Sequence, residues 1–213
     1  MAVATGVLQA ASFYSERPDD ARAVYVEIGN NVRGDGSADD TAGLQSAIDR
    51  VQETTGQGVV FIPSGRYRLS KTLYIWPGIR LIGYGATRPA FVLGENTPGY
   101  QKAPNYMVFF AGNRPGTGWG HGFMFRQPTP EEQAETAREM SRYAWARVRT
   151  NKSDTPQDAS PGTFYSALSN IDFEIEAGNP GAVAIRGRYA QHCYLAHVDF
   201  HVGSGWAGIH DGG

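Results

Sequence analysis

The stretches LSNIDFEI (residues 168–175) and LAHVDFHV (residues 195–202) are two versions of one pattern, and they decide the fold. They begin 27 positions apart, and Leu, Asp and Phe coincide when they are aligned. A self-match at a fixed period in strand-like sequence is typical of a solenoid, whose successive turns stack on each other. We therefore predict a parallel β-helix with like residues stacked in adjacent coils: Leu168 on Leu195, Ile171 on Val198, Phe173 on Phe200 and Ile175 on Val202.

The sequence before this repeat has the same strand rhythm. Apolar residues alternate with polar ones, and Gly or Pro stands at nearly every joint, which is the pattern of short strands joined by tight turns. The predicted strands are AVYVEI (23–28), GVVFIP (58–63), GRYRLS (65–70), KTLYIW (71–76), GIRLIGYG (78–85) and RPAFVLG (88–94). Residues 1–22 are expected to form an N-terminal arm, and residues 23–213 to form the β-helix.

One region interrupts this rhythm, from about residue 95 to 162. It contains a Gly-rich stretch and a segment from Thr129 to Arg149 whose charges have the polarity of a helix. We interpret the region as a helical insertion that either covers the core or walls a substrate cleft.

Three aspartates, Asp35, Asp39 and Asp40, precede a run from Thr41 with apolar residues at helical spacing. Aspartate side chains at a helix start can accept hydrogen bonds from the first backbone N–H groups. Two carboxylates that cleave a glycoside must face each other across a cleft, which neighbours at a helix start cannot do. We therefore predict a structural role in starting a capping helix that ends at Gly56.

Composition excludes several classes of function. The net charge is −2 without a block of Lys or Arg, so a nucleic-acid partner is not expected. No apolar run approaches the length that spans a membrane, and no membrane partner is expected. Cys193 is the only cysteine, and the N-terminus lacks the pattern of a signal peptide. An intracellular protein and a secreted one whose signal has been removed both fit these features.

The first half resembles the opening of the pectate-lyase-like right-handed β-helix superfamily. The motifs are GDGSADDTAGLQSAI (34–48), GVVFIPSGRYRLSKTLYI (58–75) and GIRLIGYG (78–85), within residues 24–94. The superfamily contains polysaccharide lyases, glycoside hydrolases and phage tailspikes. The resemblance implies a mainly β, right-handed parallel β-helix and leaves the reaction open.

The second half resembles the first β-helix of glycoside hydrolase family 55, the exo-acting β-1,3-glucanases. The motifs are NPGAVAIRGRYAQHCYLAHVDF (179–200) and GSGWAGIHDGG (203–213). The resemblance implies that Gln191 helps to hold the attacking water. The family's serine, expected near Gly212, is absent, so His210 or Asp211 would act in its place.

The family's general acid lies far downstream, in a second β-helix. The resemblance therefore implies that this chain is the N-terminal part of a longer enzyme. A second β-helix segment would complete the active site.

Further polar residues accompany these candidates. Asp199 and His201 share one strand face and could move a proton as a carboxylate–imidazole pair. Asp172 and Glu174 occupy the same places one coil earlier, and a solvated outer sheet face is the favoured interpretation of this ladder. Other candidates for substrate binding are Arg188, Tyr189 and Trp206.

Arg186 and Arg188 could bind an acidic sugar or pair with Glu174 and Glu176. Four of the five histidines fall between His192 and His210, but strand spacing does not bring three ligands together, so no metal is expected. No cofactor is expected either.

These features favour a glycoside hydrolase that acts on a β-glucan-type polysaccharide or oligosaccharide and is secreted or periplasmic. A lyase of acidic glycans and a non-catalytic, glycan-binding or tailspike-like β-helix are the alternatives. Carboxylates near Gln191 would favour hydrolysis, whereas a converging Arg–His cluster would favour elimination.

Overall fold

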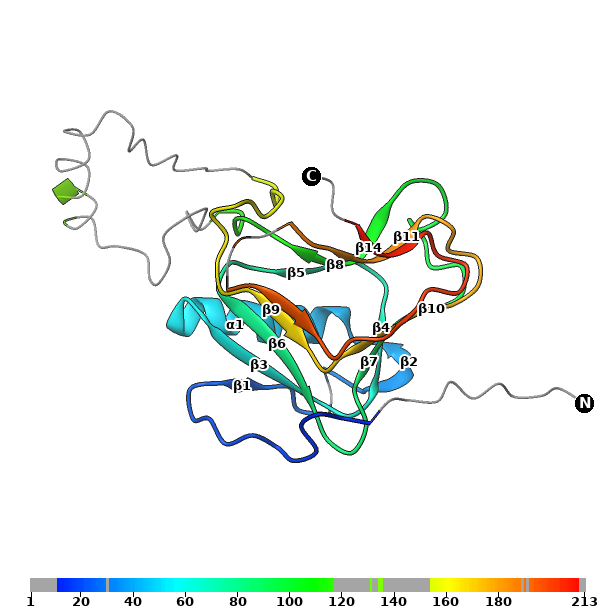
Figure 1. Cartoon of the computed structure of the whole chain (residues 1–213), viewed down its shortest axis with the longest axis horizontal. Coiled ribbons are helices and arrows are strands. Elements are labelled where there is room, and N and C mark those ends of the chain that lie inside the picture. Colours follow the sequence, from blue (N-terminus) through cyan, green and yellow to red (C-terminus); the bar gives the residue numbers. More distant parts are fainter. Residues whose placement is uncertain are drawn as a thin grey trace, which may run out of the picture.

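The protein is a parallel β-helix in which the later coils contribute one strand to each of three sheets (Figure 1). The computed structural model describes residues 11–29, 31–116, 131, 134–135, 154–188, 190 and 192–210. The first sheet contains, in order, β1 (Val24–Tyr25), β3 (Gly58–Pro63), β6 (Ile79–Tyr84), β9 (Ala167–Ser169) and β12 (Tyr194–Ala196). The second contains β2 (Asp35–Asp39), β4 (Arg66–Leu69), β7 (Ala90–Leu93), β10 (Asp172–Ile175) and β13 (Phe200–His201). The third contains β5 (Leu73–Ile75), β8 (Asn105–Phe110), β11 (Ala182–Arg186) and β14 (Ala207–His210).

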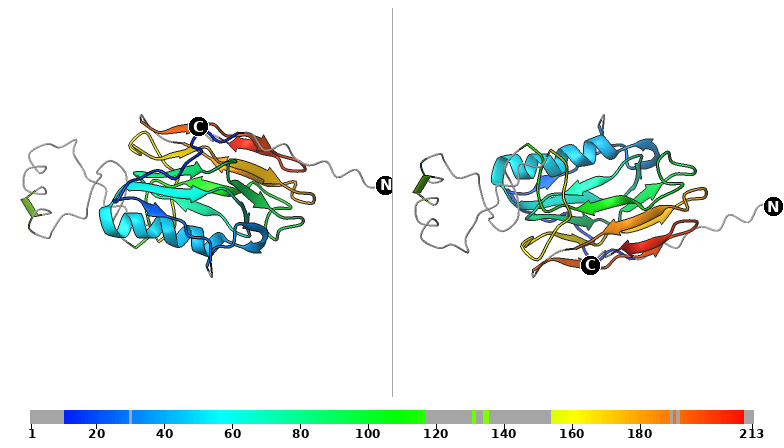
Figure 2. Two further views of the ribbon diagram at one scale, coloured as in Figure 1. Left: turned by 90° about the horizontal axis from the view of Figure 1, so that it is seen from below. Right: turned by 90° about the horizontal axis from the view of Figure 1, so that it is seen from above.

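The helix α1 (Thr41–Thr55) follows β1 and β2, at the point where each later coil has its third strand. It buries Leu44, Ile48 and Val51, the apolar positions that the sequence pattern singled out. Gly56 ends it with a positive φ of 75° and donates its N–H to the Gln52 carbonyl, as its position predicted. Figure 2 shows α1 at one end of the stack of coils and the last strands at the other.

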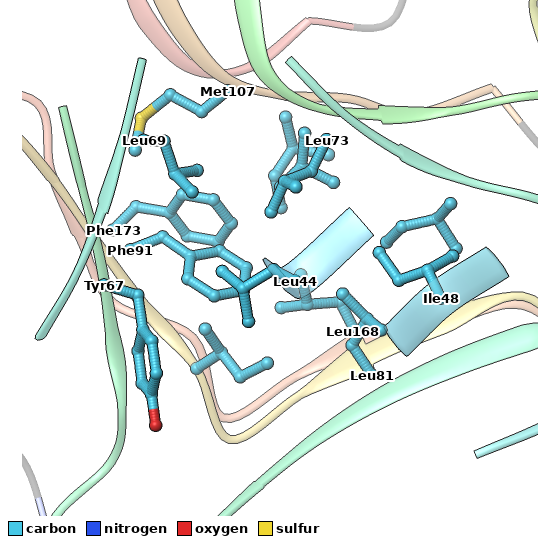
Figure 3. Packing of buried hydrophobic residues seen from close by; sticks show 14 of the residues in the cluster. Leu44, Ile48, Tyr67, Leu69, Leu73, Leu81, Phe91, Met107, Leu168 and Phe173 are labelled. Atoms are coloured by element: carbon cyan, nitrogen blue, oxygen red, sulfur yellow. The ribbon is translucent and has the colours of Figure 1, made fainter. Parts of the chain in front are cut away.

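The predicted stacking of coils is confirmed. Leu168 pairs with Leu195, and Phe173 pairs with Phe200 in parallel register. The stack extends into the earlier coils, because Phe91 pairs with Phe173 on one side and with Tyr67 on the other. Figure 3 shows the rings of Tyr67, Phe91 and Phe173 inside the core together with leucines of the other sheets. A solenoid core of this kind follows from one apolar residue repeated at the same place in each coil.

The aspartates before α1 act differently from the prediction in two respects. Residues Asp35–Asp39 form strand β2, which pairs with β4, so the segment expected as a loop belongs to a sheet. Asp39 Oδ1 accepts the Thr41 N–H at 3.0 Å, as expected at a helix start. Asp40 makes no side-chain bond to the helix. Its carboxylate is buried and accepts the backbone N–H groups of Arg33 and Gly34 instead.

The strand framework extends into the range assigned to the insertion. Strand β8 lies within residues 95–162 and pairs with both β5 and β11. The chain leaves the sheet after Ala111 and returns opposite Asp158, with which Ala111 forms an antiparallel bridge. Gly112 donates its N–H to the Gln157 carbonyl at 2.9 Å, so the two ends of the excursion are tied together. The helix expected between Thr129 and Arg149 lies almost entirely outside the described residues.

The arm is described from residue 11 and lies across the corner between the first two sheets. Phe13 donates its N–H to Asn170 Oδ1 at 2.8 Å, and its ring stacks on His197 at 4.4 Å. Gly85 donates its N–H to the Tyr14 carbonyl. The arm therefore contacts three successive coils. Within the described parts of the chain, no helix combines the length and apolar character needed to span a membrane.

Candidate functional site

The outer face of the third sheet gathers ring and charged side chains in one row. Register places Arg186 of β11 between Phe109 of β8 and His210 of β14, and Phe109 pairs in turn with Tyr74 of β5. Successive residues of a strand alternate between the two faces of a sheet. Aligned positions in parallel coils therefore form a row along the axis of the β-helix.

His210 is held by two aromatic residues at the end of this row. Its Nδ1 lies 2.9 Å from the Tyr106 hydroxyl, and the two rings stack with centroids 5.8 Å apart. Trp206 meets the His210 ring edge-on at 5.0 Å and is 55% exposed. His210 and Trp206, both proposed from the sequence, are thus brought together by β14 and the turn before it.

Arg186 forms a two-point ion pair beside this group. Its Nε and one terminal nitrogen donate to the two carboxylate oxygens of Asp158 at 2.9 and 2.8 Å. The guanidinium also lies over the Tyr106 ring, 5.8 Å from the ring centre. The hydrogen bonds from Arg186 lower the pKa of Asp158 although burial opposes this, and the positive charges of Arg186 and Arg188 add to the effect. Asp158 therefore stays ionised and fixes the arginine.

Sequence reasoning missed Asp158. It comes from the segment that returns from the excursion, which the sequence shows only as a polar stretch. Of the two alternatives for Arg186, an acidic sugar or pairing with Glu174 and Glu176, the structure shows an ion pair with a third carboxylate, that of Asp158. A polar linker residue that becomes the partner of a strand residue carries no local signal, because the contact depends on where the chain returns.

The proposed residues Asp199 and His201 lie elsewhere. They belong to the coil segment that forms β13 of the second sheet, whereas His210 belongs to the third. Asp199 Oδ2 accepts from Arg88 at 2.7 Å, and Arg88 also donates to Asp172 Oδ1 at 3.0 Å. The structure therefore shows Asp199 paired with an arginine and separates it from the His210 group.

The polar ladder on the second sheet is solvated only in part: Asp199 and His201 are exposed, whereas the expectation is wrong for Asp172 and Glu174. Asp172 is 2% exposed and Glu174 is 7% exposed. Arg66 pairs with Glu174, and Arg88 pairs with Asp172. Burial raises the pKa of Asp172 even though Arg88 and the Asp199 N–H oppose it. The arginines therefore offset the cost of removing these carboxylates from water. The apolar residues beside them in β7 could not do so.

The remaining sequence candidates divide into two groups. Arg188 is exposed and lies two residues after the end of β11. Tyr189, Gln191 and Asp211 lie outside the described residues. Their roles as water-holding or substrate-binding residues stay predictions.

The histidines each have a different neighbour. His192 stacks on Tyr165 at 5.2 Å and His197 stacks on Phe13. In the described part of the chain, no three His, Cys, Asp or Glu side chains converge as metal ligands would. The described geometry thus offers an aromatic and hydrogen-bonding surface at His210, next to a neutralised Arg–Asp pair.

Comparison with known families agrees with the resemblance inferred from the sequence. Residues 29–128 match the family model described as rhamnogalacturonase A/epimerase, pectate lyase-like. A glucan 1,3-beta-glucosidase of Cochliobolus carbonum is 32% identical over 84 residues, which are 37% of this chain and 10% of that protein. The chain thus matches about a tenth of the length of this relative. Residues 29–128 are thus similar to a pectate-lyase-like family, and part of the chain is weakly similar to a glucosidase.

Two solved structures align with most of the chain. One is PfbA, a surface adhesin of Streptococcus pneumoniae, with 13% identity, a TM-score of 0.44 and coverage of 84% of this chain and 33% of that one. The other is ORF18 of Geobacillus virus E2, with 18% identity, a TM-score of 0.43 and coverage of 84% and 25%.

Proposed function

We propose that this pectate-lyase-like domain is part of a glycoside hydrolase that acts on a β-glucan-type polysaccharide. The substrate lies on the outer face of the sheet formed by β5, β8, β11 and β14. The single observation that carries this proposal is the group of Tyr106, Trp206 and His210, which combines an exposed ring with hydrogen-bonding atoms. Sugar sites need both, because an apolar ring face packs on the sugar while polar atoms orient its hydroxyls.

The Arg186–Asp158 pair supports a neutral substrate over an acidic one. Elimination from an acidic glycan needs a cation to stabilise the charge that develops beside the sugar carboxylate. Arg186 already donates two hydrogen bonds to a carboxylate that stays ionised. Its charge is therefore balanced within the protein, and this favours the hydrolase over the lyase.

In this proposal Gln191 orients the attacking water, and His210 or Asp211 takes the place of the family's serine. We also propose Tyr189 and Arg188 as substrate-binding residues, whereas Asp199 and His201 lie on another sheet. The general acid comes from a second β-helix segment outside these 213 residues. The protein that carries the domain acts in the periplasm or outside the cell, where polysaccharides are found.

Binding of defined oligosaccharides to the 213-residue chain tests the proposal. β-1,3-Glucan oligosaccharides should bind weakly, galacturonate oligosaccharides should not bind, and nothing should be hydrolysed, since the leaving oxygen has no acid to protonate it. Trp206→Ala should weaken β-glucan binding about tenfold, the loss expected for one aromatic contact.

Tyr194→Ala is the matched control, because Tyr194 is also exposed but belongs to β12 of another sheet. Equal losses in the two variants, or tighter binding of the galacturonate series, would contradict the proposal.

A further inference from the structure

The hydrogen bond between Tyr106 and His210 joins two strands that are not neighbours. Tyr106 lies on β8 and His210 on β14, with β11 between them. The backbone at Tyr106 is anchored, because its carbonyl accepts from the hydroxyls of Thr72 at 2.7 Å and Tyr100 at 3.0 Å. Tyr100 is itself buried, which raises its pKa to about 12 and keeps it a neutral donor. The phenol is therefore held at a defined place beside the imidazole.

The donor in this bond follows from counting partners. A phenol has one proton to donate, and a neutral imidazole has one N–H and one acceptor nitrogen. Among the described residues, His210 Nδ1 is the only hydrogen-bond partner of the Tyr106 hydroxyl. If Nδ1–H donated to the phenol, the phenolic proton would be left without an acceptor in a partly buried position. Donation from Tyr106 to Nδ1 leaves no such group.

We infer that Tyr106 is a positioning residue that holds neutral His210 with its proton on Nε2. The tautomer of His210 does not depend on the proposed function, but the sugar contact described next rests on it. In that tautomer the ring presents an N–H donor on the side away from Tyr106, beside the exposed Trp206 ring. The donor fits a sugar hydroxyl or ring oxygen next to the face that stacks on Trp206.

This proton placement also determines what His210 does in the reaction. An imidazole protonated at Nε2 accepts protons only at Nδ1, and Tyr106 occupies that nitrogen. His210 therefore orients the sugar as a hydrogen-bond donor while the Tyr106 bond is intact. It does not act as a base toward the water, which Gln191 is proposed to orient.

Proton–nitrogen NMR of the 213-residue chain at neutral pH tests the tautomer directly. His210 should show the pattern of an Nε2-protonated ring, and Tyr106→Phe should convert it to a mixture or to the Nδ1-protonated form. Tyr194→Phe is the control, since the Tyr194 hydroxyl makes no hydrogen bond in the described part of the chain, and it should leave His210 unchanged. An Nδ1-protonated His210 in the unmodified chain, or an unchanged pattern in Tyr106→Phe, would overturn the inference.

Oligosaccharide binding separates this inference from the proposed function. Tyr106→Phe should weaken β-1,3-glucan binding about fivefold, the effect of one neutral hydrogen bond that orients the ring. His210→Gln places an amide N–H near the position of Nε2 and should keep most of the affinity, whereas His210→Asn should lose it. The predicted tautomer without any glycan binding would refute the proposed function and uphold the positioning role. Glycan binding together with an Nδ1-protonated His210 would uphold the proposed function and refute the positioning role.

Discussion

Asp40 shows how one residue can occupy a predicted place and make unpredicted contacts. It is the residue before α1, as the sequence indicates, but its carboxylate faces backwards. It accepts the N–H groups of Arg33 at 2.6 Å and Gly34 at 3.0 Å, and only 1% of the residue is exposed. The carboxylate therefore satisfies a turn, because two partly buried backbone donors there would otherwise lack a hydrogen-bond partner.

Asp40→Ala should lower the free energy of unfolding by about 3 kcal/mol, since it removes a charged acceptor from two partly buried donors. Asp40→Asn keeps one acceptor oxygen and should lose less. Urea denaturation of both variants measures the difference. Asp19→Ala, at an exposed position, should change stability by less than about 0.5 kcal/mol. Glycan binding should persist in folded Asp40→Asn; its loss would indicate a functional role for this aspartate.

Gln52 carries an amide that is buried and has no hydrogen-bond partner among the described residues. Gln52→Met has a similar shape without the unpaired polar atoms, so it should raise the free energy of unfolding by about 1 kcal/mol. Gln45→Met in the same helix is the matched opposite case. The Gln45 amide binds Asp49 and the backbone of Tyr74, so this variant should lose stability. Thermal melts of the two variants test both the expected gain and the expected loss of stability. A lower melting temperature for Gln52→Met would contradict the prediction.

Among the elements, the N-terminal arm depends on a corner that two coils share. Asn170 and His197 occupy the same place in adjacent coils, and both have positive φ, 59° and 53°. The Asn170 amide donates to the Gly83 carbonyl and to Ser12, and its oxygen accepts from Phe13. Gly83 has to be glycine, because a Cβ there would lie 2.0 Å from the Asn170 carbonyl oxygen. One side chain therefore links the arm to the coil beneath.

Asn170→Ala should be more destabilising than Asn170→Gly by about 1 kcal/mol, because alanine also bears the strain of a left-handed backbone. Both variants should speed hydrogen exchange at the Phe13 amide, since both remove its acceptor. At His197, Ala and Gly variants should show the same strain difference without losing any arm hydrogen bond. Unchanged exchange at Phe13 would show that the arm is held by other contacts.

The returning segment and β11 are joined by the Asp158–Arg186 pair, and this joint should depend on pH. The folded pKa of Asp158 lies below its ordinary value of 3.8, so the stabilisation is complete above 3.8 and is lost as the pH falls through the folded pKa. Asp158→Asn should therefore lower the free energy of unfolding most near neutral pH, and the difference from the unmodified chain should shrink in acid.

Asp172 should show the opposite pH dependence. Burial raises its pKa, so its ionisation lowers the free energy of unfolding as the pH rises. Denaturation across pH for Asp158→Asn and Asp172→Asn checks both.

At the scale of the whole molecule, stability comes from columns of residues that run through successive coils. Tyr67, Phe91, Phe173 and Phe200 form one such column, with Phe173 and Phe200 stacked at 5.5 Å. Phe173 has a neighbour on both sides and is fully buried, whereas Phe200 belongs to the last described coil and is only partly buried. Their contributions should differ although their contacts within a coil are alike.

Phe173→Ala should lower the free energy of unfolding by about 3–5 kcal/mol, the range for a buried phenylalanine. Phe200→Ala should cost roughly half as much, because less apolar area leaves water when the chain folds. Equal losses in chemical denaturation would mean that Phe200 is as enclosed as Phe173. Where Phe173→Ala proves too unstable to purify, Phe173→Leu keeps most of the side-chain volume. It still tests whether Phe173 contributes more to stability than Phe200.

The sequence by itself determined the repeat and therefore the fold. Strand rhythm, turn residues and the 27-residue offset are local or periodic signals, and a parallel solenoid is how such a period buries one apolar face of every coil. The limits of α1 also followed from local signals, at the aspartates before it and Gly56 after it. The choice of His210 as a site residue came from the resemblance of its motif to a known family, and Trp206 was proposed as an aromatic residue that could bind substrate.

Only the tertiary structure decided which polar groups meet. The partners Arg186 and Asp158, Tyr106 and His210, and Arg88 with Asp172 and Asp199 are 28 to 111 positions apart, and no local pattern pairs them. Each contact depends on which coil a strand joins and where the excursion re-enters the sheet. The stacking that the repeat predicts also buries Asp172 and Glu174. In a solenoid, the coils on either side cover a side chain on an inner coil, and here arginines of earlier coils pair with the two carboxylates.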